Sequence, residues 1–467
     1  MRPFPITARR GSAARSALLV VAALVVIGLL GWVVAKRYRP DLFDREAVNA
    51  AEYEALQSAR LSATPTAATD VGWPQWLGPT RDGRAPAGPL RTDWDANPPK
   101  PVWSTPCGGG YSSLSVVGGR VYGLDRQGTR ERLFCLDAEK GTPLWETGWD
   151  ADYAAMDHGA GPRAAPTVHE GRVYAVGAVG KFVCVELPSG SSTPRTLWEH
   201  DLKAEFQADT PTWGFASSPL IEGDLVIVQA GGDKGSVVAF DKKSGELRWG
   251  AGTDPNGYSS PIAATVAGVR QIIAVTGTAI VGVRPADGKV LWRHDWPTRF
   301  NGNIATPLVV GDYVFVSSAY SKGCCLLRLA ADGDGVTAER VYYRKSRVME
   351  NHHSTCVYKD GFLYGFDSDV FRCVDLRKGE VNEDWTARGL SGGVGKGCLI
   401  LADKYLIIQT QSGDLCLVDA DPAEFRLRGR VADVLSGSDC WALPVLVDGR
   451  LYLRDHTKVV CLDVRPK

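Results

Sequence analysis

The chain has 467 residues, more than a single ordinary hydrophobic core supports, so it needs either several domains or an architecture that grows by repetition. Lys plus Arg equals Asp plus Glu at 53 each, so no net charge draws the chain onto nucleic acid, which argues against a nucleic-acid partner. The 52 Gly and 14 Trp are typical of many short strands joined by tight turns, which favours an all-β fold.

The first apolar segment along the chain is residues 17–35, which contains no charged side chain. As a helix it would be about 28 Å long, close to the hydrocarbon thickness of a bilayer. A cleaved signal peptide is the alternative, but its apolar run is usually shorter, and here Lys36, Arg37 and Arg39 follow in place of a cleavage site. We therefore expect a basic tail at residues 1–16 and a single transmembrane anchor at residues 17–35, with the remainder of the chain outside the cytoplasm.

A stalk is predicted at residues 36–70, between the anchor and the rest of the chain. Apolar side chains between Asp41 and Leu61 have a spacing that allows one short helix, and a polar stretch follows at residues 63–70. Residues 71–99 then form a leader, which opens with the aromatic segment from Trp73 to Gly83.

From Val116 onwards the chain repeats a unit of 42 to 52 residues. This period matches propeller blades and is too long for leucine-rich or ankyrin units. Alternating apolar residues and Gly-rich turns predict four strands in each copy rather than helices. The best-marked strand of each copy starts at Val121, Val173, Leu225, Gln271, Tyr313, Phe362, Tyr405 and Leu451.

The turn between the third and fourth strands carries the most specific signal in the chain. The segment from Leu136 to Trp145 recurs as the segment from Phe240 to Trp249. Its Asp can accept backbone hydrogen bonds, its Gly can take a positive φ, and its Trp can wedge between adjacent sheets. Six copies have this docking Trp, at Trp103, Trp145, Trp198, Trp249, Trp292 and Trp385. The fifth copy offers only Tyr342 or Tyr343 and the seventh only Phe425, so we expect weaker junctions after those two copies.

This turn resembles the tryptophan-docking motif of the quinoprotein, or pyrroloquinoline-quinone (PQQ)-like, repeat family, over about residues 100–467. The segment from Trp73 to Gly83 is similar to the leader that precedes such propellers in bacteria. The resemblance implies an all-β, eight-bladed β-propeller at residues 100–467, on the periplasmic side of a bacterial inner membrane. Because Trp103 precedes the first complete copy and the eighth copy stops without a fourth strand, we expect residues 100–105 to complete the last blade.

The 11 cysteines do not indicate a metal or haem site. The same third-strand position holds cysteine in four copies, at Cys135, Cys184, Cys373 and Cys461, and a small residue elsewhere, which favours small buried side chains. No Cys-x-x-Cys-His occurs, so no c-type haem is attached. Cys324 and Cys325 are adjacent in the chain, and in several quinoprotein alcohol dehydrogenases two adjacent cysteines form a disulfide. Neighbouring strand residues point to opposite faces, however, which favours two independent thiols here.

The loops that join one blade to the next should meet at the propeller axis and carry function. Their candidate ligand-binding residues are Tyr111, Arg163, Trp213, Tyr258, Asn301, Asn303, His352, His353, Lys396, Asp439 and Trp441. This aromatic and amide-rich set suits a planar polar ligand, a sugar or a peptide better than a phosphate, although each residue could instead simply form its turn. His352 and His353 could serve as a base or metal ligands, but no carboxylate lies at ligand spacing nearby, so we predict no metal site and assign no catalytic residue.

Two functions remain open at this point. The compact blades and short loops favour a non-catalytic binding or scaffold module for a protein or small polar ligand, similar to propellers of bacterial envelope assembly. The alternative is a PQQ-dependent alcohol dehydrogenase with PQQ and Ca²⁺ at the central mouth, a family with longer inserts and an evident acidic site. Such a site could be assembled from Trp441 or Trp213, Arg163 or Lys396, and Asn301, Asn351 and Asp439.

Overall fold

The computed structural model describes residues 48–61, 71–85, 88–154, 156–187, 193–345, 347–383, 385, 396–437 and 439–466. The chain divides into the units Met1–Glu46 and Ala47–Lys467, and every described residue lies in the second unit. Within these ranges no helix is long and apolar enough to cross a membrane. The predicted tail at residues 1–16, the predicted anchor at residues 17–35 and most of the predicted stalk lie outside the described residues.

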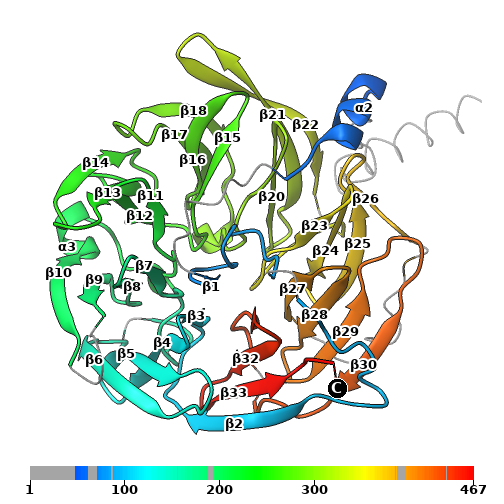
Figure 1. Ribbon diagram of the computed structural model, residues 1–467. Helices are drawn as coiled ribbons and strands as arrows, with labels where there is room; N and C mark the ends of the chain where they lie inside the picture. The colour runs from blue at the N-terminus through cyan, green and yellow to red at the C-terminus, as the bar shows by residue number, and fades with distance from the viewer. Residues whose placement is uncertain are drawn as a thin grey trace, which may run out of the picture. The chain divides into compact units, whose positions relative to one another are not determined.

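Eight antiparallel sheets are arranged around a common axis, which confirms the predicted eight-bladed propeller (Figure 1). Blades 1 and 2 contain β3 (Ser115–Val117), β4 (Arg120–Gln127), β5 (Arg130–Asp137), β6 (Pro143–Asp150), β7 (Thr167–His169), β8 (Arg172–Val176), β9 (Lys181–Glu186) and β10 (Arg195–Asp201). Blades 3 and 4 contain β11 (Leu220–Glu222), β12 (Leu225–Gln229), β13 (Val237–Asp241), β14 (Leu247–Ala251), β15 (Ile262–Val266), β16 (Val269–Val275), β17 (Ala279–Val283) and β18 (Val290–Asp295). Blades 5 and 6 contain β19 (Leu308–Val310), β20 (Tyr313–Ser318), β21 (Gly323–Asp332), β22 (Gly335–Arg344), β23 (Val357–Lys359), β24 (Phe362–Asp367), β25 (Val370–Asp375) and β26 (Glu380–Val381). Blades 7 and 8 contain β27 (Cys398–Ala402), β28 (Tyr405–Gln409), β29 (Leu415–Asp419), β30 (Leu427–Val431), β31 (Val445–Val447), β32 (Arg450–Arg454), β33 (Lys458–Asp463) and the N-terminal β2 (Lys100–Pro106).

The repeat pattern in the sequence locates the blades correctly. Each of the eight predicted strand starts lies within the first three residues of the second strand of its blade. The predicted closure is also confirmed, because β2 pairs with β33 in an antiparallel register that places Trp103 opposite Cys461. Pairing the first strand of the propeller with its last removes the two free edges that an open ring would expose.

Three of the six docking tryptophans, Trp103, Trp249 and Trp385, donate a hydrogen bond to the turn of the following blade. The indole Nε1 of Trp103 donates to the carbonyl of Ala138 at 3.1 Å, and that of Trp249 donates to the carbonyl of Pro285 at 2.8 Å. The turn glycine Gly141 has φ +71°, and a Cβ on it would lie 2.5 Å from the Trp103 ring. Glycine is therefore required there both by the backbone conformation and by the close approach of the indole.

The fifth junction is better made than the sequence suggested. Tyr342 is fully buried and its hydroxyl donates to the carbonyl of Leu376 at 2.8 Å, the same kind of bond that Trp103 and Trp249 make. The guanidinium of Arg344 adds bonds to the carbonyls of Gly379 at 3.1 Å and Lys378 at 2.7 Å. The expectation of a weak junction after blade 5 is wrong, because a Tyr with an Arg neighbour replaces the Trp.

The seventh junction is completed by the leader. Phe425 packs edge-on against Trp385, with ring centres 5.0 Å apart, rather than against blade 8. Trp94 is fully buried and packs against Gly429 in β30. A Cβ added to Gly429 would lie 2.6 Å from the Cβ of Trp94. The backbone N–H of Arg91 donates to the carbonyl of Val464 in blade 8 at 2.7 Å. Trp94 thus fills the space that a docking Trp of blade 7 would otherwise occupy.

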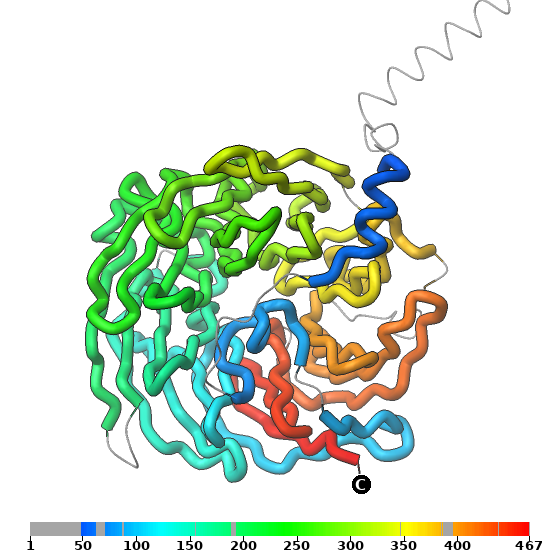
Figure 2. The backbone as a smooth tube through the Cα atoms, turned by 45° about the horizontal axis from the view of Figure 1, so that its top comes forward, coloured from blue at the N-terminus to red at the C-terminus, as the bar shows by residue number. Residues whose placement is uncertain are grey.

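The start of the leader crosses the propeller axis. Its strand β1 (Gly72–Trp73) pairs with β3 of blade 1 and lies near the centre of the ring (Figures 1 and 2). Pro74 accepts from the backbone of Val168 in blade 2, and the buried guanidinium of Arg81 donates to the carbonyls of Ser218 and Pro219 at 3.1 and 2.9 Å in blade 3. The start of the leader therefore contacts blades 1, 2 and 3 at once and joins them near the centre of the ring.

The predicted stalk helix is present in part, as α2 (Ala50–Ser58), which Asn49 caps by accepting from the backbone N–H of Glu52 at 2.9 Å. Glu52 accepts from the Tyr313 hydroxyl at 2.6 Å, and Leu56 is buried beside blades 5 and 6. The carbonyl of Arg60 accepts from Gly311, in the turn between the first and second strands of blade 5. That turn lies at the end of the first strand remote from the inter-blade loops, so α2 lies on the face opposite those loops. Two short helices lie within the loops, α3 (Leu202–Phe206) and the 3₁₀ turn η2 (Arg299–Asn301).

All eleven cysteines are free thiols. Cys324 and Cys325 are adjacent in β21, fully buried, and pack into different hydrophobic clusters on the two sides of the sheet. The prediction of two independent thiols is confirmed, because the regular strand turns the two side chains away from each other.

Candidate functional site

One residue in each blade lies at the same position, where the inter-blade loop enters the first strand. In seven blades this position is four residues before the first strand, and in blade 7, whose first strand begins earlier in the repeat, it is two residues before it. All eight residues line a single cavity, which we call the axial cavity. In blade order they are Tyr111, Arg163, Ala216, Tyr258, Ile304, His353, Lys396 and Trp441.

The local sequence explains why these side chains are free to face the axis. Two residues further along, several blades have a small hydroxyl residue whose oxygen accepts from the backbone N–H of an adjacent blade. Ser260 accepts from Ser218 at 3.0 Å, Ser218 from Ala165 at 2.9 Å, and Thr355 from Thr306 at 2.9 Å. These hydroxyls join the blades, and their small size leaves room for the preceding side chain to project into the mouth.

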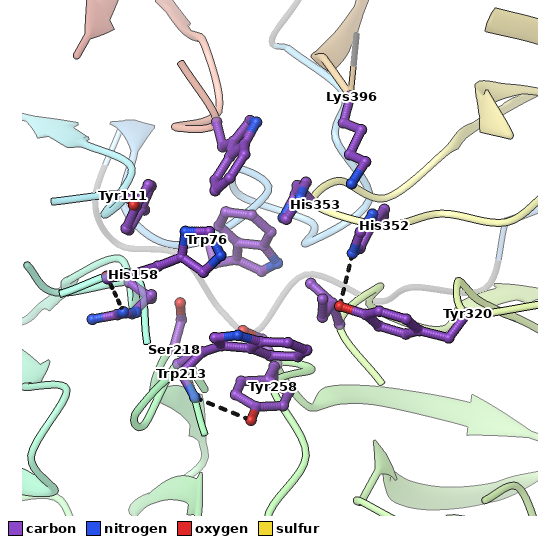
Figure 3. A pocket seen from close by; sticks show the side chains of 15 residues that line it. Trp76, Tyr111, His158, Trp213, Ser218, Tyr258, Tyr320, His352, His353 and Lys396 are labelled. Carbon is purple, nitrogen blue, oxygen red and sulfur yellow. Dashed lines mark hydrogen bonds between the residues drawn. The ribbon is translucent and has the colours of Figure 1, made fainter. Parts of the chain in front are cut away.

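The axial cavity has a volume of about 210 Å³. Trp76 of the leader contributes to its lining from the centre of the ring and is held by a 2.9 Å bond from its Nε1 to the hydroxyl of Thr306 (Figure 3). Further lining side chains come from the inter-blade loops, at His158, Trp213 and His352, and from the turn after β20, at Tyr320.

Aromatic rings form two stacked groups around the cavity. Trp441 stacks on His353 with ring centres 3.8 Å apart and planes 7° apart, and His353 stacks on His352 at 4.1 Å. Trp213 stacks on Tyr320 with ring centres 5.8 Å apart and planes 12° apart. A 2.9 Å hydrogen bond between His352 Nε2 and the Tyr320 hydroxyl connects the two groups (Figure 3). The walls are therefore flat, apolar faces with few exposed polar atoms.

The cavity contains two cationic side chains, Arg163 and Lys396. Burial lowers the pKa of both groups, which means that the surroundings disfavour their charged forms. No Asp or Glu is among the residues described as lining the cavity. Arg163 is held in place by bonds to the carbonyls of Gly161 at 2.5 Å and His158 at 2.6 Å, with its guanidinium carbon 5.4 Å from the centre of the Tyr111 ring. Glu131 lies near Arg163, and Asp369 and Asp439 lie near Lys396, but none of these carboxylates lines the cavity. An anionic ligand would provide a charge partner within the cavity itself.

Two of the lining histidines, His352 and His353, are neutral at neutral pH. Burial, aided by the charge of Lys396, lowers the pKa of His352 to about 4, and burial with the neighbouring His352 lowers the pKa of His353 well below its usual range. Burial also raises the pKa of Tyr320 to about 12, so its hydroxyl keeps its proton. These groups therefore offer uncharged donors and acceptors rather than additional charge.

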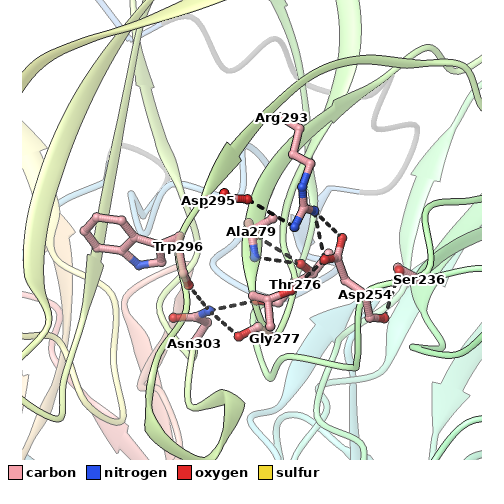
Figure 4. A network of polar contacts seen from close by, with 10 residues as sticks. Ser236, Asp254, Thr276, Gly277, Ala279, Arg293, Asp295, Trp296 and Asn303 are labelled. Atoms are coloured by element: carbon pink, nitrogen blue, oxygen red, sulfur yellow. Dashed lines mark hydrogen bonds and ion pairs between the residues drawn. The ribbon is translucent and has the colours of Figure 1, made fainter.

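The structure brings together most of the predicted site residues. Eight of the eleven line the axial cavity, at Tyr111, Arg163, Trp213, Tyr258, His352, His353, Lys396 and Trp441. Asn301, Asn303 and Asp439 do not line it. Asn303 is fully buried and its amide nitrogen donates to the carbonyls of Thr276 at 2.8 Å and Trp296 at 3.1 Å, so it braces the loop (Figure 4). Asn301 lines a neighbouring cavity, and Asp439 faces Gln411 at 3.4 Å.

Three aromatic lining residues were missed in the sequence. Trp76 was placed in the leader and used only as evidence of the family, although the aromatic residues of that segment could have indicated a binding role. Tyr320 lies in a turn between the second and third strands, and His158 lies in a long loop ahead of blade 2, so neither follows the position that repeats. Nothing in the sequence indicates that those two side chains reach the axis.

The lining does not fit a quinone held by Ca²⁺. That ion takes carboxylate, amide and carbonyl oxygens as ligands, yet the described lining residues include no Asp, Glu, Asn or Gln. Throughout the described ranges no three His, Cys, Asp or Glu side chains are grouped to hold a metal ion. Cys324 and Cys325 also lie outside the cavity, within the sheet of blade 5.

Comparison with known proteins agrees with the fold. Residues 129–386, more than half of the chain, match the family described as outer membrane protein assembly factor BamB. The chain belongs to the BamB family. This confirms the resemblance to PQQ-like repeat propellers. Within the family, the outer membrane protein assembly factor BamB of Burkholderia pseudomallei (strain K96243) is 31% identical over 173 residues, which are 36% of this chain and 38% of that relative. The match thus spans less than half of the relative's length.

Two solved structures share the architecture of this BamB family member. BamB from Moraxella catarrhalis aligns with a TM-score of 0.52 and 14% identity, over 78% of this chain and 97% of that chain. Quinohemoprotein alcohol dehydrogenase from Comamonas testosteroni aligns with a TM-score of 0.57 and 12% identity, over 92% of this chain and 84% of that chain. At such identities these likenesses show the fold alone.

Proposed function

We propose that this chain is a non-catalytic binding propeller of the bacterial envelope, which holds a protein partner through a flat, negatively charged group inserted in the axial cavity. In this proposal residues 17–35 anchor the chain in the inner membrane, and the propeller at residues 100–467 lies on the periplasmic side. Membership of the BamB family supports the proposal, since the Burkholderia relative is named as an outer membrane protein assembly factor.

The observation that carries the proposal is the composition of the axial cavity. Stacked rings provide flat apolar faces, and Arg163 and Lys396 provide positive charge in a lining that includes no described carboxylate. A cationic ligand would be repelled by these two side chains. A sugar would meet no Asp, Glu, Asn or Gln side chain among the described lining residues, and a phosphate cradle of glycine N–H groups is not among them either.

The position of the cavity also supports a role in holding a partner. The chain reaches the propeller through α2, on the face opposite the inter-blade loops that form the cavity. The helix α2 therefore does not cover the cavity, which leaves the inter-blade loops available to a partner.

The test is calorimetric titration of the full-length chain, in a non-ionic detergent, with 2-naphthoate as a flat anion and 2-naphthamide as its neutral analogue. At a binding free energy of about 0.3 kcal/mol per non-hydrogen atom, a ligand of this size (about 13 atoms) binds with a Kd of about 1 mM. Naphthoate is expected to bind at least about fivefold more tightly than the amide, because only the anion pairs with the two cations.

Arg163→Gln and Lys396→Gln should each weaken naphthoate binding and leave naphthamide binding unchanged. Lys140→Gln is the matched control, because it removes the same charge from an exposed turn outside the cavity. Equal binding of the two naphthalenes would contradict the proposal. Oxidation of alcohols by the chain in the presence of PQQ and Ca²⁺, followed with an artificial electron acceptor, would contradict its non-catalytic part.

A further inference from the structure

Three histidines line the axial cavity beside its two cations. His352 and His353 lie ahead of the first strand of blade 6, and His158 lies in the loop ahead of blade 2. Both His352 and His353 are partly exposed, as are Arg163 and Lys396, so a ligand in the cavity can reach them. Histidine is the side chain whose ordinary pKa places its change of charge between about pH 5 and pH 8. The cavity therefore contains groups whose charge a ligand can alter.

The two cations differ in how well the protein itself satisfies them. The guanidinium of Arg163 donates to carbonyls of its own loop, and Glu131 is close enough to affect its pKa. The ammonium of Lys396 makes no hydrogen bond or ion pair with any residue that the structure describes, although Asp369 and Asp439 are close enough to affect its pKa. An acidic group of a ligand therefore gains most beside Lys396, where the positive charge has no direct partner.

Positive charge also surrounds the pair formed by His352 and His353. Burial, then the charges of Lys396 and His158, lower the pKa of His352 to about 4. Burial and then the neighbouring His352 lower the pKa of His353, and Lys396 and His158 add to this effect. The charged groups that act on the two rings include no carboxylate of the described residues. An anion beside Lys396 would supply negative charge next to the pair and would raise both pKa values.

The side chains packed against the pair leave most of its ring nitrogens without a partner. Tyr320, in the turn after β20, bonds to Nε2 of His352 at 2.9 Å, and the Trp441 ring stacks on His353. Glu350 lies two residues ahead of His352, but its carboxylate accepts from the backbone of the turn after β20 at 3.1 Å. Among the described residues, Nδ1 of His352 and both nitrogens of His353 have no hydrogen-bond partner. A proton added to one of these nitrogens is therefore available to a bound acidic group.

We propose that the acidic group of the partner binds beside Lys396, His352 and His353, and that this histidine pair takes up a proton from solvent as the group binds. The partner is then held more tightly as the pH falls below neutrality. This inference rests on the proposed function, and it names the part of the axial cavity that takes the anion and the condition that regulates its binding.

Proton uptake strengthens binding only on the acid side of neutrality. In the free protein the pKa of His352 is about 4, so the ring is neutral at pH 5.5. A bound anion that restores the ordinary value of 6.5 leaves the ring mostly protonated at that pH. Linkage then gives uptake of about 0.9 proton per anion at pH 5.5, and binding about tenfold tighter than at pH 7.5.

The test is calorimetric titration of the full-length chain, in a non-ionic detergent, with 2-naphthoate at pH 7.5 and pH 5.5, where this ligand is ionised. Each titration is repeated in two buffers of different ionisation enthalpy, because the difference in heat counts the protons taken up. We expect uptake of close to one proton and about tenfold tighter binding at pH 5.5, whereas neutral 2-naphthamide should show neither effect. Equal naphthoate affinity at both pH values without proton uptake would overturn the inference and leave the proposed function standing. Absence of naphthoate binding at both pH values would refute the two together.

Variants locate the proton. The double variant His352→Gln/His353→Gln should lose both the proton uptake and the pH dependence of naphthoate binding. His294→Gln is the matched control and should keep both, since burial also lowers the pKa of His294 but this residue lies in β18, outside the cavity. Arg163→Gln should weaken binding at both pH values and keep the tenfold ratio, because the proton is taken up beside Lys396. A ratio that persists in the double variant, or that is lost in Arg163→Gln, would overturn the inference.

Discussion

Replacement of Trp94 by Ala should destabilise the propeller although Trp94 lies outside every blade. The indole is fully buried between β30 of blade 7 and the end of blade 8, and its Nε1 donates to the carbonyl of Arg91 at 2.8 Å. Removal of a buried Trp costs about 3–5 kcal/mol, because the loss of burial is added to the cost of the cavity that remains. With about 400 ordered residues and about 2.1 cal/mol/K of unfolding entropy per residue, this corresponds to a fall in melting temperature of about 4–6 °C.

The control is Phe425→Ala, which removes the side chain that the repeat pattern alone assigns to this junction. Phe425 is half-buried and packs against Trp385 instead, so its loss should cost about 1 kcal/mol and lower the melting temperature by about 1–2 °C. The assay is scanning calorimetry or far-UV circular dichroism of the full-length chain, since the loss of a Trp would alter fluorescence directly. If Phe425→Ala proves as destabilising as Trp94→Ala, the leader does not complete the seventh junction and the reasoning is refuted.

Three further results are expected. Arg81→Met should lower the free energy of unfolding by about 3 kcal/mol in denaturant melts, because it leaves the carbonyls of Ser218 and Pro219 without their donor. Arg81→Lys should recover only part of this free energy. An unchanged free energy of unfolding in Arg81→Met would show that the leader does not stabilise the ring of blades. The pKa of His352 is near 6.5 in the unfolded chain and about 4 in the folded one, so the unfolded chain binds more protons between these pH values and stability should fall as the pH falls through this window. His352→Gln should therefore reduce the difference in melting temperature between pH 7 and pH 5. An unchanged difference would count against burial of a neutral imidazole. A thiol reagent should modify at most Cys107, the one partly exposed cysteine, in the native protein. In the denatured protein it should modify all 11 thiols without prior reduction. Only nine reactive thiols in the denatured protein would indicate a disulfide.

The sequence predicts the blades well because each blade repeats the same physical solution. The second strands, the closing pairing of β2 with β33 and the docking of Trp103 all follow from turn glycines and apolar alternation, which are local signals. The error at the fifth junction has a different origin. Tyr342 makes the docking bond with its hydroxyl and Arg344 reinforces it, and this combination does not resemble the Trp pattern although it fulfils the same role.

The leader was the part that sequence reasoning could not place. Its tryptophans, Trp73, Trp76 and Trp94, contact blade residues that are far away in the sequence. They also lie outside the repeat that marks the blades, so the repeat does not predict their positions. Trp76 binds Thr306, which lies 230 positions away in sequence, so only the folded ring brings the two together. Contacts that depend on the closed architecture are not encoded in any local pattern, and the same holds for Tyr320 and His158 at the cavity.

The axial position shows why the chemistry of this propeller could be partly predicted even though its ligand could not. At the position two residues further along, four blades have a small hydroxyl residue that accepts from the backbone of an adjacent blade, at Ser113, Ser218, Ser260 and Thr355. At the axial position the side chain projects into open space, and packing imposes no common size, so the eight blades range from Ala216 to Trp441. Variation at a repeated position that has no structural task is therefore where function is expected. The two cations there face a cavity whose described lining includes no carboxylate, which ties that variation to an anionic ligand.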